Sequence, residues 1–395
     1  MGIKVSMIIP SYNRYPQNLL TLFSLQNQTF NPSNLEVIFV DDGSTDLTSK
    51  IVKAFHPPFS FHYIRCEKNN GRSKARNIGI KKATGEIIIF LDAEMIVNPD
   101  FVQNHYNHHH AHQKKVITGS LGYYSLFSFI FPELNKKDLK RIAKLVESDD
   151  IYLKRYQTFL KTNRAVQMIF QEDIDSLKFR KLAYYSQLHV DRKIISKFGE
   201  ELTGFQMPWM VFLTGNVSVR KELLKSAGFF DETLQGWGFE DWELGYRLYK
   251  CGAAFAFKQN VTSYHQEHPV TSNHNWKASL KNFNLFQQKH PHIDVLVIIF
   301  ILLGKYNRLE VHEILKQYKA LEQKYPNRFN NFKEMIPILL KTALSHLLAG
   351  KPATNLFLKS QNYYRKKPTQ YERDTIKSLG IFNQLVHAFD YLNSL

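Results

Sequence analysis

The sequence predicts an α/β protein with a doubly wound, mostly parallel sheet, and three observations support this fold class. Short apolar runs alternate with helical patterns through residues 1–91. The last of these runs is almost continuously apolar, as expected for a strand that is buried on both faces of a parallel sheet. Acidic and polar residues follow the ends of three runs, which is where doubly wound sheets bind their ligands.

Alternating strands and helices account for the first part of the chain, in the order β-α-β-α-β-α-β. The expected strands are residues 5–10, 35–40, 61–66 and 86–91. The expected helices are residues 18–28, 44–55 and 74–84. Ser44 or Thr45 caps the second helix and Gly85 stops the third, because these residue types favour helix starts and ends.

The rest of the chain divides into an insertion, a second part of the α/β domain and a helical tail. Charged, aromatic-rich helices without clear strands are expected over residues 123–201, and a strand-like pattern returns at 209–219. Helices follow at 221–227 and 240–250, and the chain past residue 275 is helical and basic. The expected domain segments are 1–118 and 205–272 for the two halves of the α/β domain, 119–204 for the helical insertion and 273–395 for the C-terminal helical region.

The net charge is strongly positive, at +17, from 52 Lys and Arg against 35 Asp and Glu. Such a field attracts polyanions: nucleotides, anionic lipid surfaces, acidic glycans or nucleic acid. No zinc-ligand spacing, aromatic RNA-binding strand motif or helix-turn-helix pattern occurs, so only the charge supports nucleic acid. We therefore expect no nucleic-acid partner.

Several signals indicate a cytoplasmic protein. Only two cysteines occur, which favours a reducing compartment, and Met1 leads into an expected strand without a signal-peptide pattern. The longest apolar run, residues 295–303, is shorter than the roughly 20 residues that span a bilayer, so we expect a buried helix there. Lys and Arg alternate with Phe and Tyr over residues 351–367. A peripheral position on the anionic inner face of the membrane is therefore an alternative to a solvated surface.

A tract at residues 236–243 reads Gly-Trp-Gly-Phe-Glu-Asp-Trp-Glu. It places the adjacent carboxylates of Glu240 and Asp241 at the start of an expected helix, where about half a positive charge favours their ionised forms. Trp237 and Trp242 offer flat apolar faces for sugar rings, and the glycines permit close approach of a ligand. The tract predicts a site that deprotonates a sugar hydroxyl, with a capped helix bearing solvated acids as the alternative.

The fourth expected strand ends in Asp92-Ala93-Glu94. Two carboxylates at positions i and i+2 of a strand exit can face the same way and bind a divalent cation through oxygen. Mg²⁺ or Mn²⁺ held by few protein ligands keeps positions open for phosphate oxygens. The motif therefore predicts a metal–diphosphate site.

Five histidines lie in and just after the helix that leaves this loop. They are His105, His108, His109, His110 and His112. We expect a solvated helix face, with a metal site as the alternative, because no second ligand set is in view.

Four tracts, taken in order, resemble the successive signatures of family 2 glycosyltransferases of the GT-A fold. They read Ile-Ile-Pro-Ser-Tyr-Asn at 8–13, Val-Asp-Asp-Gly-Ser-Thr-Asp at 40–46, Gly-Arg-Ser-Lys-Ala-Arg-Asn-Ile-Gly at 71–79 and Phe-Leu-Asp-Ala-Glu at 90–94. Thr-Gly-Asn-Val-Ser-Val-Arg at 214–220 is similar to the acceptor half of that family. The tract at 236–241 is similar to the Gly-Trp-Gly acidic motif of galactosyltransferase-type enzymes. The resemblance covers residues 3–118 and 205–270.

The resemblance implies a nucleotide-sugar site at the strand ends. Tyr12 and Pro10 would border the nucleobase, and Asp42 or Asp41 would accept a hydrogen bond from a uracil imide. Arg76, with Arg72 and Lys74, would lie near the diphosphate or the donor sugar. The implied nucleotide-sugar-binding residues are Pro10, Ser11, Tyr12, Asn13, Asp41, Asp42, Arg72, Arg76, Asp92 and Ala93.

The resemblance also implies the catalytic, acceptor and metal residues. Asp241 would be the catalytic base and Glu240 would orient the acceptor. The implied acceptor-sugar residues are Trp237, Gly238 and Trp242, and the implied ligands of Mn²⁺ or Mg²⁺ are Asp92, Glu94 and His265. The family usually ends its metal motif with Asp, and Glu94 is one methylene longer. If Glu94 does not reach the ion, Asp92 and His265 would hold it with waters.

The implied activity is an inverting, metal-dependent transfer of a sugar from a nucleotide donor, a UDP-sugar, to a hydroxyl. The implied acceptor is a glycan or a lipid-linked or cell-surface polymer. A helix N-terminus lowers a carboxylate pKa, so Asp241 is expected to be ionised at neutral pH. One alternative is a catalytically silent nucleotide- or carbohydrate-binding protein on the same fold, against which the intact acidic positions argue. Another is a nucleotidyltransferase, whose glycine-rich, Arg-containing loop after the first strand is missing.

Overall fold

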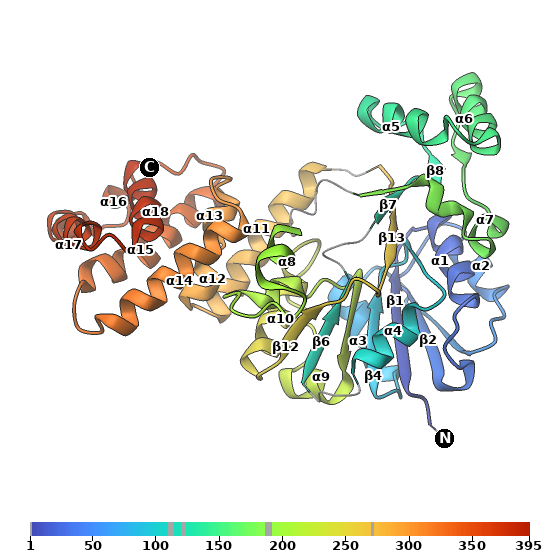
Figure 1. Ribbon diagram of the computed structural model, residues 1–395, viewed down its shortest axis with the longest axis horizontal. Coiled ribbons are helices and arrows are strands. Elements are labelled where there is room, and N and C mark those ends of the chain that lie inside the picture. The colour runs from blue at the N-terminus through green and yellow to red at the C-terminus, as the bar shows by residue number, and fades with distance from the viewer. Residues whose placement is uncertain (1, 110–113, 120–123, 186–191, 270–271) are drawn as a thin grey trace. The chain divides into compact units, whose positions relative to one another are not determined.

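The computed structural model describes residues 2–109, 114–119, 124–185, 192–269 and 272–395 (Figure 1). These residues form two compact units. The first comprises Met1–Leu202, Pro208–Gly236 and Glu240–Ser272, and the second comprises Thr203–Met207, Trp237–Phe239 and Asn273–Leu395.

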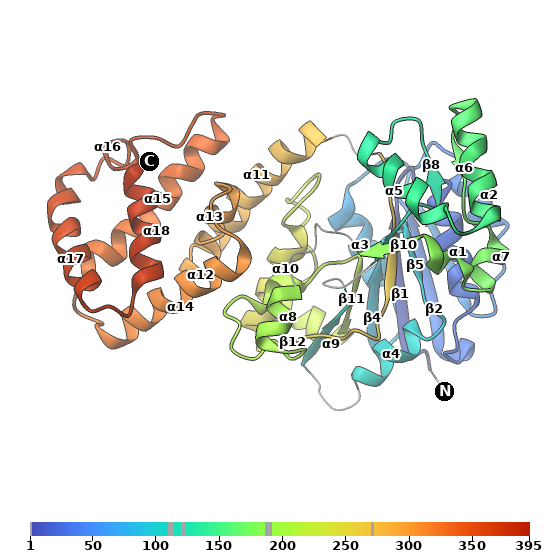
Figure 2. The same cartoon turned by 45° about the horizontal axis from the view of Figure 1, so that its top comes forward.

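A seven-stranded sheet forms the centre of the first unit, in the order β12-β6-β11-β4-β1-β2-β3. Its strands are β1 (Val5–Ser11), β2 (Leu35–Asp41), β3 (Ser60–Arg65), β4 (Ile87–Leu91), β6 (Lys115–Thr118), β11 (Asn216–Arg220) and β12 (Ala254–Phe257). β1 pairs in parallel with β2 and β4, and β2 pairs in parallel with β3. β11 runs antiparallel between β4 and β6, and Figure 2 shows β11, β4, β1 and β2 side by side. The predicted α/β fold class with a parallel-rich sheet is confirmed.

Helices follow the parallel strands as the sequence predicts. They are α1 (Gln17–Gln26), α2 (Thr48–Lys53) and α3 (Arg72–Lys82) after the first three strands, and α4 (Phe101–His108), α9 (Lys221–Ala227) and α10 (Glu240–Lys250) later in the unit. α2 begins later than expected, because Ser44 donates its N–H to Asp41 (2.8 Å) and Thr48 donates to Asp46 (2.9 Å) in a preceding turn. α3 packs on β1 at Gly79, where a Cβ atom would lie 2.4 Å from Cγ2 of Ile8.

A second, four-stranded sheet in the order β10-β7-β13-β5 corrects the expectation of an insertion without strands. Its strands are β5 (Met95–Val97), β7 (Tyr124–Leu126), β10 (Ala183–Tyr185) and β13 (Ser263–Gln266), and β8 (Phe129–Ile130) pairs separately with β9 (Val166–Gln167). The strands β7 to β10 have two or three residues each, too few to leave a periodic pattern in the sequence. The helices of this segment are α5 (Lys136–Val146), α6 (Asp150–Thr162), α7 (Gln171–Asp175), α8 (Arg192–Phe198) and the 3₁₀ turn η3 (Lys178–Leu182).

The expected strand over 209–219 begins only at Asn216. The residues before it form the 3₁₀ turn η4 (Pro208–Val211), and its Trp209 is fully buried. The indole of Trp209 meets the ring of Tyr246 on α10 edge-on, with centroids 5.3 Å apart. The apolar pattern of this stretch therefore reflects core packing against α10 rather than strand pairing.

The second unit is helical, as the sequence predicts. Its helices are α11 (Ser272–Lys289), α12 (Ile293–Leu296), α13 (Ile299–Leu302), α14 (Arg308–Lys324), α15 (Asn330–Leu348), α16 (Leu356–Lys359), the 3₁₀ turn η5 (Tyr363–Arg365), α17 (Lys366–Ser378) and α18 (Asn383–Ser394). α18 packs against both α14 and α15, and α17 packs against α15. The apolar run at 295–303 forms α12 and α13, and its residues up to Phe300 are buried. Within the described residues, no helix is both long and apolar enough to cross a membrane.

Candidate active site

The carboxyl ends of β1 and β2 lie side by side, because the register pairs Ser11 with Asp41. Asp41 is fully buried and accepts hydrogen bonds from the Ser44 N–H (2.8 Å) and the Tyr63 hydroxyl (2.7 Å). Asp42 accepts from the backbone N–H groups of Asn70 and Gly71, both at 2.9 Å. Asp41 thus stabilises its own loop, and Asp42 fixes the segment that leads into α3.

The loop after β1 is held to the loop after β2. Asn13 adopts a left-handed backbone conformation (φ 51°), its side-chain oxygen accepts from the Thr45 N–H (2.8 Å), and its N–H donates to Ser44 Oγ (3.0 Å). Ser11 is buried and Pro10 is half-buried, whereas 45% of Tyr12 is exposed. Of the four residues expected to bind the nucleotide at the end of β1, Tyr12 therefore offers the accessible flat face that stacking on a base requires.

Arg76 on α3 lies at the centre of three carboxylates. Its Nη2 lies 3.3 Å from Asp92 Oδ1, and its Nη1 lies 3.3 Å from Glu240 Oε1 and 3.5 Å from Asp241 Oδ1. Only 2% of Arg76 is exposed. Burial alone would lower the pKa of Arg76, but the charges of Asp241, Asp92 and Glu240 outweigh it and raise that pKa. The structure therefore joins the end of β4 to the start of α10 through one buried cation.

Asp241 is oriented by Thr214, which precedes β11. The Thr214 N–H donates to Asp241 Oδ2 (3.0 Å), and the Thr214 hydroxyl lies 3.0 Å from Oδ1. Burial raises the pKa of Asp241 to about 7, and the charges of Glu240 and Asp92 add to this rise, while Arg76 and the Thr214 N–H oppose it. The expectation of a lowered pKa was therefore wrong. A partly buried site between two other carboxylates outweighs the helix N-terminus.

Arg72 and Lys74, the two other basic residues of the tract at 71–79, differ from Arg76 in their surroundings. Arg72, at the start of α3, is half-buried and Lys74 is exposed. In the part of the chain that the structure describes, neither side chain forms an ion pair with a carboxylate, in contrast to Arg76.

Glu94, His265 and His268 form a candidate metal site. Each offers one ligand atom, and the three atoms lie within 4.8 Å of one another. The pairing of β13 with β5 sets this geometry, because His265 lies opposite Met95 and the Gln266 N–H donates to the Glu94 carbonyl (3.0 Å). One carboxylate oxygen and two imidazole nitrogens suit a divalent transition metal such as Mn²⁺.

Charged neighbours set the protonation of this group. Burial would raise the pKa of Glu94, but His268 and the charge of Arg14 outweigh it and hold that pKa below its usual range. Burial would lower the pKa of His265, but the hydrogen bond and charge of Glu267 outweigh it and raise that pKa. A bound cation would therefore displace a proton from His265.

His268 was not predicted from the sequence, although its spacing of three residues from His265 was visible. The expected ligand Asp92 is not in the group of three, since its carboxylate meets Arg76 instead. The neighbouring Ala93 is buried, and its carbonyl accepts from the Thr21 hydroxyl (2.7 Å).

The tryptophans and Gly238 of the acidic tract are divided between the two units. Trp242 belongs to the first unit, is half-buried and meets Trp209 edge-on at 6.3 Å. Trp237 and Gly238 belong to the second unit, where 47% of Trp237 is exposed. The Gly238 carbonyl accepts from Asn282 (2.9 Å), and a Cβ atom on Gly238 would lie 2.8 Å from Ser279 Oγ. Close packing on α11 therefore accounts for this glycine.

The expectation that the histidine run forms a solvated face was wrong for two of its members. His105 and His109 are fully buried and lie 2.8 Å from Ser218 Oγ, and His105 also contacts Asn216 (3.0 Å). Burial lowers the pKa of both histidines to about 3. They are neutral core residues that tie α4 to β11. His108 contacts Asn260, and His110 and His112 lie outside the described residues.

Two family models match most of the first unit. Residues 6–183 match "Glycosyl transferase family 2", and residues 196–269 match "N-terminal domain of galactosyltransferase". The two matches together contain the strand ends, the Arg76 carboxylate group and the candidate metal ligands.

Curated relatives extend the likeness. The chain is 29% identical over 343 residues to the uncharacterized glycosyltransferase YfnE of Bacillus subtilis. This match covers 85% of this chain and 84% of YfnE. The chain is 31% identical over 296 residues to hyaluronan synthase of Pasteurella multocida, and 29% identical over 296 residues to chondroitin synthase of Escherichia coli. These matches cover 74% and 73% of this chain but only 28% and 38% of the two synthases.

Among solved structures, residues 1–349 of Staphylococcus aureus TarS in complex with UDP-GlcNAc match with a TM-score of 0.50 and 16% identity. The match covers 94% of this chain and 92% of that one. At this identity the likeness shows a shared fold.

Proposed function

Because the chain belongs to the family 2 glycosyltransferases, we propose that it transfers a sugar from a UDP-sugar to a hydroxyl of a polysaccharide, with inversion at the anomeric carbon. The observation that carries the proposal is the group of Asp92, Glu240 and Asp241 around Arg76. This group puts the expected catalytic base beside the strand end where donor binding is expected.

The relatives support the choice of donor and acceptor. Hyaluronan synthase and chondroitin synthase are named for polysaccharide products, and TarS is named as a poly(ribitol-phosphate) β-N-acetylglucosaminyltransferase, 28% identical over 198 residues. TarS has also been solved with UDP-GlcNAc. We propose a polymeric acceptor and a UDP-linked donor by this analogy.

Asp241 acts as the general base in the proposed reaction. It takes the proton from the acceptor hydroxyl as that oxygen attacks the anomeric carbon from the face opposite the diphosphate. Its hydrogen bonds from Thr214 orient the carboxylate, and a pKa of about 7 suits proton transfer at neutral pH. General-base assistance contributes about 10²- to 10⁴-fold in rate. Glu240, next along the helix, orients the acceptor.

The donor binds at the ends of β1, β2 and β4 in this proposal. Tyr12 stacks on the base, and Asp42 accepts from the uracil imide. Arg76 acts as a positioning residue, because its guanidinium already faces three carboxylates. Arg72 and Lys74 then contact the diphosphate, since neither forms an ion pair within the described part of the chain.

Glu94, His265 and His268 would hold the divalent cation. A cation bound there supplies positive charge and Lewis-acid contact to the departing diphosphate. Glu94 contributes an ionised carboxylate because Arg14 and His268 keep its pKa low. The side chain of Asp92 is 31% exposed and pairs with Arg76. Its carboxylate would join these three ligands if it rotated away from Arg76 when the donor binds.

The test is UDP release from a panel of UDP-sugars with Mn²⁺ and an oligosaccharide acceptor, for the wild type and Asp241→Asn. We expect the variant to lose about 10²-fold or more of the transfer rate while still binding UDP. Glu222→Gln, an exposed change on α9, is the matched control and keeps the wild-type rate. Near-normal transfer by Asp241→Asn would remove the assignment of the base.

A catalytically silent binding protein is the competing proposal. It predicts that the wild type binds UDP but releases none from any UDP-sugar of the panel. The cytoplasmic location indicated by the sequence stays a prediction.

A further inference from the structure

The positive charge of the chain is concentrated in its C-terminal helical region. Residues 273–395 contain 18 Lys and Arg against eight Asp and Glu, a net charge of +10 out of +17 for the whole chain. No acidic residue occurs between Glu334 and Glu372. The basic residues of that stretch are Lys341, Lys351, Lys359, Arg365, Lys366 and Lys367. Such a field attracts an anionic partner.

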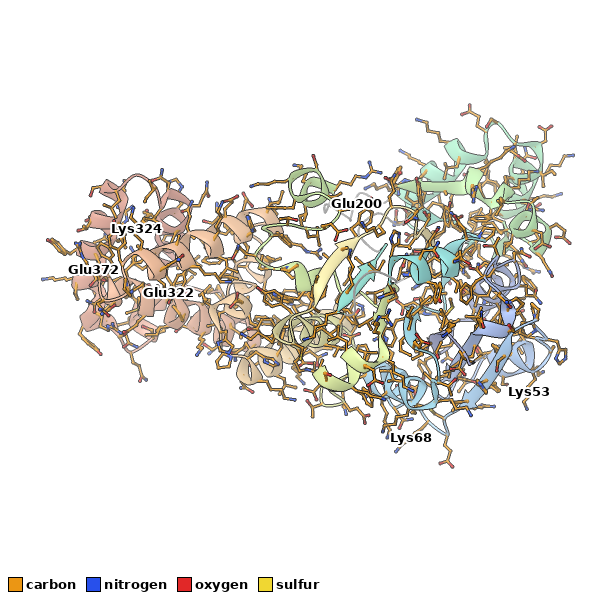
Figure 3. The ribbon with its side chains drawn as sticks, turned by 60° about the horizontal axis from the view of Figure 1, so that its bottom comes forward. Lys53, Lys68, Glu200, Glu322, Lys324 and Glu372 are labelled. Carbon is orange, nitrogen blue, oxygen red and sulfur yellow. The ribbon has the colours of Figure 1, made fainter. Side chains whose placement is uncertain are left out.

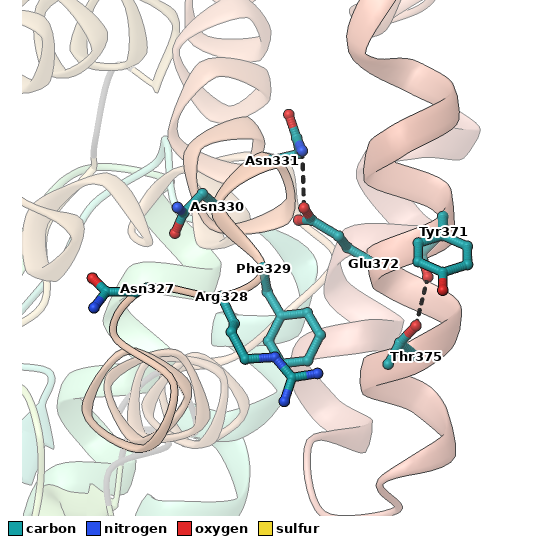
Figure 4. A pocket seen from close by; sticks show the side chains of 8 residues that line it. All are labelled: Asn327, Arg328, Phe329, Asn330, Asn331, Tyr371, Glu372 and Thr375. Atoms are coloured by element: carbon teal, nitrogen blue, oxygen red, sulfur yellow. Dashed lines mark hydrogen bonds between the residues drawn. The ribbon is translucent and has the colours of Figure 1, made fainter.

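A polar pocket of about 390 Å³ opens within this region (Figure 4). Its walls come from the turn between α14 and α15, the start of α15 and one side of α17. The lining residues used below are Asn327, Arg328, Asn330, Asn331, Tyr371 and Glu372. The amides of Asn327 and Asn330 and the guanidinium of Arg328 offer hydrogen-bond donors and acceptors suited to hydroxyls and anions, whereas the amide of Asn331 already bonds to Glu372 and Arg365.

Arg328 is held in place but is not neutralised. Its guanidinium carbon lies 5.1 Å from the ring centre of Phe329 and 5.7 Å from that of Tyr325, so aromatic faces fix its position. Arg328 is exposed, and within the described residues it forms no ion pair. Arg365 and Arg373 differ, because they pair with Glu334 and Asp390.

The one carboxylate of the pocket already has partners. Glu372 accepts from Asn331 Nδ2 (2.8 Å) and from the Phe332 N–H (2.7 Å) at the start of α15. These bonds cap the helix and set the Glu372 charge against the positive end of the helix dipole. Arg328 therefore remains the uncompensated charge of the pocket.

Exposed aromatic rings extend the pocket along α17. Tyr364 is 78% exposed and Tyr371 is 76% exposed, the two highest values for large hydrophobic side chains within the described residues. The 3₁₀ turn η5 leads directly into α17. Because the two tyrosines lie seven residues apart, about two helical turns, they share one side of this segment with Lys367 between them. Tyrosine combines a flat apolar face with a hydroxyl, which suits stacking on a sugar ring.

We propose that this pocket and Tyr364 bind an anionic glycan chain, with Arg328 on its carboxylate or phosphate group. The proposal rests on the proposed glycosyltransferase function and names its acceptor as an anionic polymer, bound at a site additional to the catalytic one. The polar lining favours a glycan over a membrane. Asn side chains inside a concave pocket can meet hydroxyls of a chain that enters it, whereas a bilayer surface remains outside.

The test is calorimetric binding of hyaluronan oligosaccharides and of a polyol-phosphate polymer to the full chain. We expect at least one polymer to bind, and Arg328→Ala/Tyr371→Ala to weaken that binding about tenfold or more. Tyr364→Ala, outside the pocket lining, should weaken it to a lesser degree. Lys53→Ala, at the exposed end of α2 (Figure 3), removes one equal charge outside the site and should change affinity less than about twofold.

Three results would overturn the site. The first is that neither polymer binds, and the second is that the double variant binds like the wild type. The third is that Lys53→Ala weakens binding as much as the double variant does. Phosphatidylglycerol vesicles form the last arm. If the double variant loses vesicle binding while no polymer binds, the surface serves a membrane instead. UDP binding should stay unchanged in every variant. Loss of UDP binding by the wild type would contradict the proposed glycosyltransferase function, whereas loss of polymer binding alone would contradict only this site.

Discussion

At the scale of single residues, Arg76 and Asp241 determine each other's properties. A fully buried guanidinium faces three carboxylates; the cation and each carboxylate stabilise each other's charged forms, while the carboxylates repel one another. Asp241 still has a raised pKa of about 7, because burial and two neighbouring carboxylates outweigh one cation. The base is therefore about half ionised at neutral pH rather than fully ionised.

The pH profile should report this pKa. We expect kcat/KM to rise about tenfold per pH unit up to pH about 7 and then to level, because the free enzyme must carry an ionised Asp241. The folded pKa lies above the ordinary value of 3.8. Asp241 therefore contributes stability that is present below that value and lost as pH rises through about 7. A flat kcat/KM profile across neutral pH would contradict the assignment.

Replacing Arg76 should damage folding as well as catalysis. Arg76→Met leaves three carboxylates without their common cation, and loss of one partner of a buried ion pair costs about 3–5 kcal/mol. The free energy of unfolding, measured with urea, should fall by this amount. Arg72→Met, at the start of the same helix, should change it by less than about 1 kcal/mol, since that side chain forms no ion pair in the described structure. Equal losses in the two variants would contradict a special role for Arg76.

At the scale of elements, the sequence identified what depends on local pattern. Strand β4 is continuously apolar and buried, and β1 and β2 are buried along almost their whole length, so their apolar runs were visible in the sequence. β3, at the edge of the sheet, is only half-buried, and its bounds were predicted to within one residue. Strands β7 to β10 were not predicted, because a strand of two or three residues shows no periodicity and its partners lie far along the chain. The sequence predicts a strand where the 3₁₀ turn η4 lies, because Trp209 and its neighbours are apolar core residues.

The same reason explains which site residues were missed. Glu94 and His265 were predicted from motifs, but His268 lies after β13 and approaches Glu94 only through the pairing of β13 with β5. The buried roles of His105 and His109 also depend on β11, more than 100 residues away. Sequence patterns show which residues can ligate, and strand pairing decides which of them meet.

A change at His268 tests the metal site. We expect His268→Ala to raise the Mn²⁺ concentration for half-maximal UDP release by about tenfold or more, because one of three ligands is lost. His56→Ala is the matched control, since His56 is exposed on the loop before β3. Unchanged Mn²⁺ dependence in His268→Ala would leave Asp92, Glu94 and His265 as the ligand set.

At the scale of the whole molecule, the chain combines an α/β unit with a helical unit. Composition predicted the helical region and its charge, since basic and glycine-poor patterns are visible in the sequence. The assignment of Trp237–Phe239 to the second unit was not predictable, because packing on α11 decides it. The meeting of Arg76 with Asp241 was not predicted, because the family resemblance placed Arg76 near the diphosphate or the donor sugar and made Asp241 the catalytic base without pairing the two.

The measurement that tests the central claim most directly is a calorimetric titration of the full chain with UDP, with and without Mn²⁺, for the wild type and Glu94→Gln. We predict metal-dependent binding that Glu94→Gln abolishes or weakens about tenfold or more, while Glu222→Gln binds like the wild type. Absence of UDP binding by the wild type under both conditions would contradict the donor site proposed at the strand ends.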